Sequence, residues 1–257
     1  MARLVDGIRF TGSVGNMSAY QLKGTDTIVV RSKGGASKNQ IKTSPAFRLT
    51  RENNSEWAFC ARAGSHIRDT LRYVRHLADY RFVPVLNKLA KHVQLMDTTN
   101  NRGERKISFA EHKSLLDGFN LNRKYTFDNI VRHPLNYSVD SLTGTVRIQL
   151  PNLIPGINLH LPWQFPVYRF VVSLGILDDS QYLVKANDNG LVEHVYSGWQ
   201  MAKSPYAGEQ LELTAGRILT ETETMVLAVG IEMGSPLTNT LIVPEKKAGA
   251  AKILGVA

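Results

Sequence analysis

Histidine and cysteine are the side chains to consider first as zinc ligands, and cysteine is also a candidate nucleophile. The seven histidines are scattered, at positions 66, 76, 92, 112, 133, 160 and 194. None stands in the H-E-x-x-H spacing, and the single cysteine, Cys60, cannot build a thiolate zinc site. The sequence therefore predicts no metal site and no cofactor.

Motifs for phosphate binding and acyl transfer are also missing. The stretch KGGASK at residues 33–38 matches neither G-x-x-x-x-G-K-[ST] nor G-x-G-x-x-G, and no G-x-S-x-G elbow occurs. Asp178, Asp179 and Asp188 lie where turns are expected, which explains them without calcium. We therefore expect no catalytic residue. An enzyme of an unrecognised class is the third alternative, because active sites can assemble from residues distant in sequence.

The basic charge belongs to one half of the chain. Residues 1–127 hold 22 Lys and Arg against 10 Asp and Glu, a net charge of +12, whereas residues 128–257 carry −3. Such asymmetry indicates either an anionic partner or complementarity between copies of the protein. A solvated surface explains it equally well.

Three arginines of the basic half are candidates for anion binding. Arg48, Arg51 and Arg62 lie on the side of the first predicted helix that faces away from its apolar stripe. Rows of this kind neutralise phosphates, and their affinity falls as salt rises. Against this reading, no known nucleic-acid-binding motif is present, and acids interrupt the row.

The elements that would position these residues begin with short strands. Alternating apolar residues and Gly- or Asn-bearing turns predict a three-stranded meander over residues 4–10, 17–23 and 27–31. Because a terminal strand can pair with a neighbouring chain, Leu4, Ile8 and Phe10 are the candidate self-association edge.

Two helices are predicted next. Ser44 and Pro45 are a helix start, and apolar residues repeat at 4-3-4-3 spacing from Cys60 to Val74, with Phe47, Trp57 and Ala61 extending the stripe upstream. A second stripe covers residues 82–96 with the same spacing. Two such stripes joined by a short loop predict an antiparallel helical hairpin.

After residue 120 the pattern becomes that of strands. Residues 135–139 and 145–150 predict a hairpin, and an Asn-Gly pair within residues 187–190 predicts another tight turn. Further strands are expected at residues 167–174, 181–185, 191–196, 210–214, 225–232 and 251–256. This number of short strands favours a β-sandwich.

The predicted fold class is therefore α+β. A basic N-terminal module over residues 1–120 combines a β-meander with a helical hairpin, and an all-β sandwich-like domain covers residues 121–257. The single cysteine, the lack of a secretory signal and the absence of a long apolar run predict a cytoplasmic protein without a membrane span.

Several short phrases are spread along the sequence: GSVGN at residues 12–16 with Tyr20 and Gly24, RSKGG at 31–35, SPAF at 44–47 with TREN at 50–53, MDTT at 96–99 with Gly103, and AGAAK at 248–252. Together they resemble a protein family of the Bacteroidota bacteria whose function is unknown. The resemblance runs nearly end to end. It implies a bacterial, cytoplasmic origin and supplies no catalytic residue.

Together these observations predict a non-enzymatic assembly or interaction protein. Self-association through the terminal strands would give a homo-oligomer or filament. The alternative is nucleic-acid or other anionic-polymer binding through the basic half.

Overall fold

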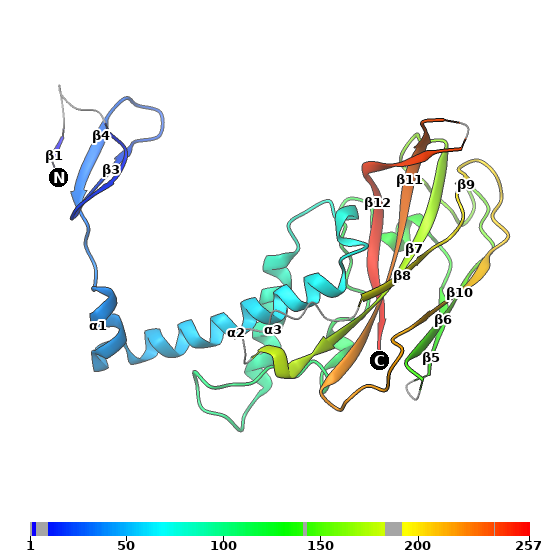
Figure 1. Cartoon of the computed structure of the whole chain (residues 1–257). Coiled ribbons are helices and arrows are strands. Elements are labelled where there is room, and N and C mark those ends of the chain that lie inside the picture. Colours follow the sequence, from blue (N-terminus) through cyan, green and yellow to red (C-terminus); the bar gives the residue numbers. More distant parts are fainter. Residues whose placement is uncertain (1, 4–9, 141–142, 183–191, 239) are drawn as a thin grey trace. The chain divides into compact units, whose positions relative to one another are not determined.

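The computed structural model describes residues 2–3, 10–140, 143–182, 192–238 and 240–257. It is 25% helical and 36% strand, and its three sheets are antiparallel (Figure 1). The α+β class predicted from the sequence is thus confirmed. The chain divides into two compact units, Met1–Arg51 and Glu52–Ala257, and the predicted boundary at residue 120 lies within the second unit.

A four-stranded sheet of order β1-β4-β3-β2 dominates the N-terminal unit. Its strands are β1 (Ala2–Arg3), β2 (Gly12–Val14), β3 (Met17–Gln21) and β4 (Ile28–Ser32). A two-residue turn joins β2 to β3, and its first residue, Gly15, has φ +54, which a residue with a side chain rarely adopts. The strands predicted at residues 17–23 and 27–31 are present as β3 and β4. Of the strand predicted over residues 4–10, residues 4–9 lie outside the described residues, and Phe10 is not in a strand.

Helices follow the small sheet. Helix α1 (Lys38–Thr43) begins with a capping box, in which Ser37 accepts from the Gln40 N–H and the Gln40 side chain accepts from the Ser37 N–H. The predicted start at Ser44 and Pro45 opens a short 3-10 helix, η1 (Pro45–Phe47), which leads into α2 (Arg48–Thr70). Helix α2 runs unbroken through Gly64, and the side chain of Asn87 on the neighbouring helix fills the space that a Cβ atom would take there.

Helix α3 (Val83–Met96) lies against α2, and the short 3-10 helix η2 (Arg75–Leu77) precedes it. Contacts between the two helices run in opposite order along the chain: Cys60 pairs with Gln94, and Gly64 with Asn87. The stripe from Cys60 to Val74 is buried as predicted. Its upstream extension is wrong, because Trp57 is 54% exposed and Ala61 is exposed too.

The second predicted stripe is buried only in part. Phe82, Leu86 and Val93 are buried, whereas Leu89 is half-buried and Met96 is exposed. Ala90 and Gln94 take the remaining buried positions on α3. Met96, where the stripe ends, is the last residue of α3.

Two sheets make up the rest of the second unit. A three-stranded sheet of order β10-β6-β5 holds the predicted hairpin, and the larger sheet has the order β12-β11-β7-β8, with β9 also paired to β7. The smaller sheet contains β5 (Asn136–Asp140), β6 (Thr145–Leu150) and β10 (Glu209–Thr214). The larger contains β7 (Val167–Asp178), β8 (Val192–Tyr196), β9 (Gln200–Met201), β11 (Glu223–Pro236) and β12 (Ile242–Val256). Short helical turns are η3 (Lys113–Leu115), α4 (Phe127–Ile130) and η4 (Asp179–Tyr182).

One sequence prediction in this region differs from the structure, and another falls on residues that the structure does not describe. Residues 181–182, predicted to start a strand, belong to η4, because β7 runs on to Asp178 and the chain then turns. The Asn-Gly turn predicted within residues 187–190 lies outside the described residues.

Each face of the larger sheet packs into its own core. Side chains alternate along β7, so Phe170 and Val172 join a core that includes residues of the smaller sheet such as Ile148. Val171, between them, points to the other face and joins the core that contains Ile67 of α2. The helices and the smaller sheet therefore cover opposite faces of the larger sheet (Figure 1).

Candidate functional site

The N-terminal unit buries few side chains. Among its described residues 10–51, only Ala19, Ile28 and Val29 are buried. Large apolar side chains of the same strands and turns are exposed instead, namely Val14 (57%), Met17 (49%), Tyr20 (38%) and Leu22 (43%). This unit thus offers apolar surface beside a very small core.

The strand register distributes these side chains over two faces. Val14 lies opposite Met17, so both belong to the face that also carries Ala19. The other face carries Tyr20, which lies opposite the buried Val29, and Arg31, whose guanidinium stands over the Tyr20 ring at 5.4 Å from its centroid. One face is therefore apolar, and the other combines an aromatic ring with a cation.

Most of the net charge lies in this unit. Residues 1–51 contain nine Lys and Arg and two Asp, which gives +7 of the +9 carried by the whole chain. The basic side chains in the described part are exposed at Lys23, Arg31, Lys33, Lys38, Lys42 and Arg48. Its surface is thus strongly cationic.

The three predicted anion-binding arginines have different surroundings. Arg51 uses its guanidinium within the N-terminal unit, donating to the carbonyl oxygens of Ile41 and Ser44 at 2.8 Å each. Arg62 stands over the ring of Phe59 at 5.1 Å, and Arg48 is exposed. Arg51 therefore fixes the turn between α1 and α2, and anion binding by the three stays a prediction.

The predicted self-association edge can be located only in part. Leu4 and Ile8 lie outside the described residues, and Phe10 is half-buried ahead of β2. In the described part, β2 has β3 as its one strand partner. The outer side of β2 is therefore a sheet edge within the described residues.

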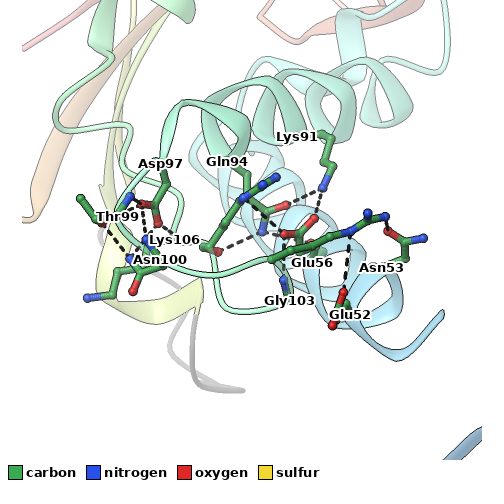
Figure 2. A network of polar contacts seen from close by, with 12 residues as sticks. Glu52, Asn53, Glu56, Lys91, Gln94, Asp97, Thr99, Asn100, Gly103 and Lys106 are labelled. Atoms are coloured by element: carbon green, nitrogen blue, oxygen red, sulfur yellow. Dashed lines mark hydrogen bonds and ion pairs between the residues drawn. The ribbon is translucent and has the colours of Figure 1, made fainter. Parts of the chain in front are cut away.

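A buried carboxylate organises the contact between α2, α3 and the loop after α3 (Figure 2). Glu56 is 1% exposed and accepts from Lys91 Nζ at 2.5 Å and from the Gly103 N–H at 3.0 Å, and Arg105 Nε lies at 3.8 Å. Burial by itself raises the pKa of Glu56, but these donors and cations outweigh it and lower that pKa below its ordinary value. The charge is satisfied internally, so its role is to hold residues 97–106 against the helices.

Asp97 closes the same loop from its other end (Figure 2). Its two oxygens accept from the N–H and hydroxyl of Thr99, the N–H and amide of Asn100, and the N–H of Lys106, at 2.7–3.1 Å. The Lys106 N–H contributes most to holding the pKa of Asp97 far below its ordinary range. With its lone pairs used in this way, Asp97 is a loop anchor rather than a metal ligand.

A second buried acid gathers residues that are far apart in sequence. Glu232 of β11 is 2% exposed and lies opposite Arg169 of β7, whose Nε donates to it at 2.6 Å, and His76 Nε2 lies at 2.9 Å. Although burial raises the pKa of Glu232, the contacts with His76 and Arg169 lower it overall. The Arg169 guanidinium stands over the rings of Tyr196 and Trp199, at 3.8 and 4.5 Å. No motif linked these residues, because the strand register brings them together.

Among the described residues, Cys60 and the aspartates expected at turns have structural surroundings. Cys60 is fully buried, and burial raises its pKa to about 11, as expected for an inert thiol. In the part of the chain that the structure describes, no three His, Cys, Asp or Glu side chains are placed to hold a metal ion. Asp178 accepts from the N–H and hydroxyl of Ser180, as its predicted turn role requires.

Two neighbouring cavities of about 430 and 440 Å³ open beside residues 105–112 and share Lys106, Ser108 and Glu111. In the first, the Asp179 carboxylate accepts from the Ser108 hydroxyl at 3.1 Å and from the Ala110 N–H at 2.9 Å. These contacts join the loop to the end of β7. The lining of the two cavities contains both acidic and basic side chains, and these do not form a site for one class of ligand.

Comparison with known proteins adds no family or fold relative. No protein-family model, no curated protein and no solved structure matches the chain. None of the helices in the described residues is both long and apolar enough to cross a membrane. The site must therefore be interpreted from its own geometry.

Proposed function

We propose that this protein is a non-enzymatic assembly and interaction protein of the bacterial cytoplasm, and that its N-terminal unit is the binding module. The observation that carries the proposal is the surface of that unit, where four large apolar side chains are exposed over a core of three buried ones. Small domains bury a low share of their surface and are correspondingly marginal. A partner that covers Val14 and Met17 would stabilise the unit.

The second unit supports this role as a scaffold. The two packed sheets make a sandwich-like arrangement, with both sheets contributing to one core. The helical pair covers the other face of the larger sheet. Such a unit would present the module without being reshaped by binding.

The edge of β2 gives a concrete route to self-association. Pairs in an antiparallel ladder alternate between hydrogen-bonded and non-hydrogen-bonded, and the two-residue turn makes Val14 and Met17 a hydrogen-bonded pair. The next pair, Ser13 with Ser18, then directs the Ser13 N–H outward. A strand of another copy would accept from that N–H and extend the sheet.

Ser13→Pro tests this route in the full chain. Proline removes the outward N–H, and edge strands tolerate it where the N–H faces solvent. Ser13→Ala is the matched control because it changes the side chain and keeps the donor. Sedimentation velocity at tens of micromolar should show an oligomer for the wild type and for Ser13→Ala, and a smaller species for Ser13→Pro. A monomeric wild type, or a Ser13→Pro protein of wild-type mass, would refute assembly through β2.

A further inference from the structure

We propose that the N-terminal unit binds single-stranded nucleic acid across the sheet face that carries Tyr20 and Arg31. The inference rests on the proposed role of this unit as the binding module, and it names the partner. We call these two residues, with the strands β3 and β4 that hold them, the Tyr20 face.

The first step is electrostatic. Residues 10–51 contain seven Lys and Arg and one acid, Asp26. Copies of such a unit repel one another, so a compensating negative charge would strengthen assembly through it. A nucleic-acid strand supplies that charge along its whole length and would bring several copies together.

The second step is the chemistry of the Tyr20 face. Tyr20 is 38% exposed on β3, an inner strand of the sheet, and Arg31 on the adjacent β4 holds its guanidinium over the ring. Aromatic rings and guanidinium groups on a cationic surface are the elements that bind single strands, because bases stack on them whatever their sequence. The buried Val29 lies opposite Tyr20 on the neighbouring strand and on the same face of the sheet.

The geometry favours a single strand over a duplex. Bases in a duplex already stack on one another, so an aromatic ring on a sheet reaches them only when they are free. An acidic protein would satisfy the charge, but it would gain little from the exposed ring. The Tyr20 ring therefore distinguishes these partners.

The experiment measures fluorescence anisotropy of full-length protein with a labelled single strand of about 20 nucleotides, enough for one or more sites. A duplex of the same length is the comparison, and salt is varied from about 50 to 200 mM. The variants are Tyr20→Leu, which keeps an apolar side chain, and Arg31→Gln. The matched controls lie in the second unit: Tyr137→Leu, a tyrosine of similar exposure (40%), and Lys203→Gln, an exposed cation.

We expect the single strand to bind more tightly than the duplex. Tyr20→Leu should weaken single-strand binding by about 5- to 150-fold, the range for losing one base–aromatic stack, without changing the salt dependence. Arg31→Gln should reduce the slope of log affinity against log salt by about 0.7, the value for one lost phosphate contact. Both controls should bind as the wild type does, and thermal melting of each variant should show that it is folded.

Three results would overturn the inference. They are no binding at about 50 mM salt, where phosphate contacts are strongest, equal binding of duplex and single strand, and wild-type affinity of Tyr20→Leu. The first would leave an acidic protein as the partner. Assembly has its own test, the effect of Ser13→Pro on native mass. Either proposal can therefore fail while the other stands.

Discussion

The side chain of Leu77 occupies the space above the Cα atom of Gly230, so that a Cβ atom added there would lie 2.7 Å from Leu77 Cδ1. Leu77 is 1% exposed and also approaches Gly249 of β12, so it cannot move aside without opening the core. Gly230→Ala should therefore lower the free energy of unfolding by about 1–3 kcal/mol, as overpacking does. Urea denaturation measures the change.

Gly198 provides the control for that substitution. A Cβ atom there would meet only the Gln200 amide, at 3.7 Å, and its φ needs no glycine. Gly198→Ala should be neutral or slightly stabilising, because it reduces the entropy of the unfolded chain. Equal effects of the two substitutions would show that the close contact between Leu77 and Gly230 does not exclude a side chain.

The buried stripe of α2 allows a sharper test of the helical packing. Leu71, the residue directly after the end of α2, continues this stripe and is fully buried, so Leu71→Asp should cost several kcal/mol by placing an unpaired charge in the core. Leu95 on α3 is 52% exposed, and Leu95→Asp should change stability by less than about 0.5 kcal/mol. Melting temperatures report both, and an unchanged Leu71→Asp protein would contradict the packing of α2.

The contacts of Glu56 predict that substitution of one partly exposed lysine lowers stability strongly. Lys91→Met removes the cation nearest a carboxylate that is 1% exposed, and breaking a buried pair costs about 3–5 kcal/mol. The nearby surface pair of Arg102 and Glu52, at 3.9 Å, is the comparison. Arg102→Gln should cost less than about 1 kcal/mol. Chemical denaturation of the two variants checks the difference, and similar costs would mean that Glu56 does not depend on Lys91.

Glu223 should make the free energy of unfolding depend on pH in the acidic range. Arg217 holds the Glu223 carboxylate through both oxygens, and this contact, with the Thr220 N–H, lowers its pKa from 4.5 to about 2. A lowered pKa in the folded state adds stability above pH 4.5 that is lost as the pH falls toward 2. The difference in unfolding free energy between wild type and Glu223→Gln should therefore shrink over that interval. A difference independent of pH would contradict the ion pair.

Local patterns predicted the two long helices and most strands because each depends on neighbouring residues. The 4-3-4-3 spacing around Ile67 located the buried side of α2, and alternation over residues 145–150 located β6. The same spacing misled at Trp57, since an apolar stripe does not reveal where its packing partner ends.

The polar clusters could not be predicted in this way. His76 and Glu232 are 156 residues apart, and they meet only because β11 brings Glu232 beneath η2. In the sequence, Glu56 is one of the acids that interrupt the row of arginines. Its burial depends on the loop that brings Gly103 to it, 47 residues later. Such contacts follow from register and loop closure, which no short motif encodes.

The core between the helices and the larger sheet is completed only late in synthesis. Leu71 of the early chain shares that core with Ala251 and Ile253, and Asn122 bonds the backbone of Leu77 to that of Gly249 and Ala251. At translation rates of about 5–20 residues per second, roughly 10–40 s separate the emergence of these parts. For that time the apolar side of α2 lacks its final cover, and a nascent chain at this stage is a natural client for a chaperone.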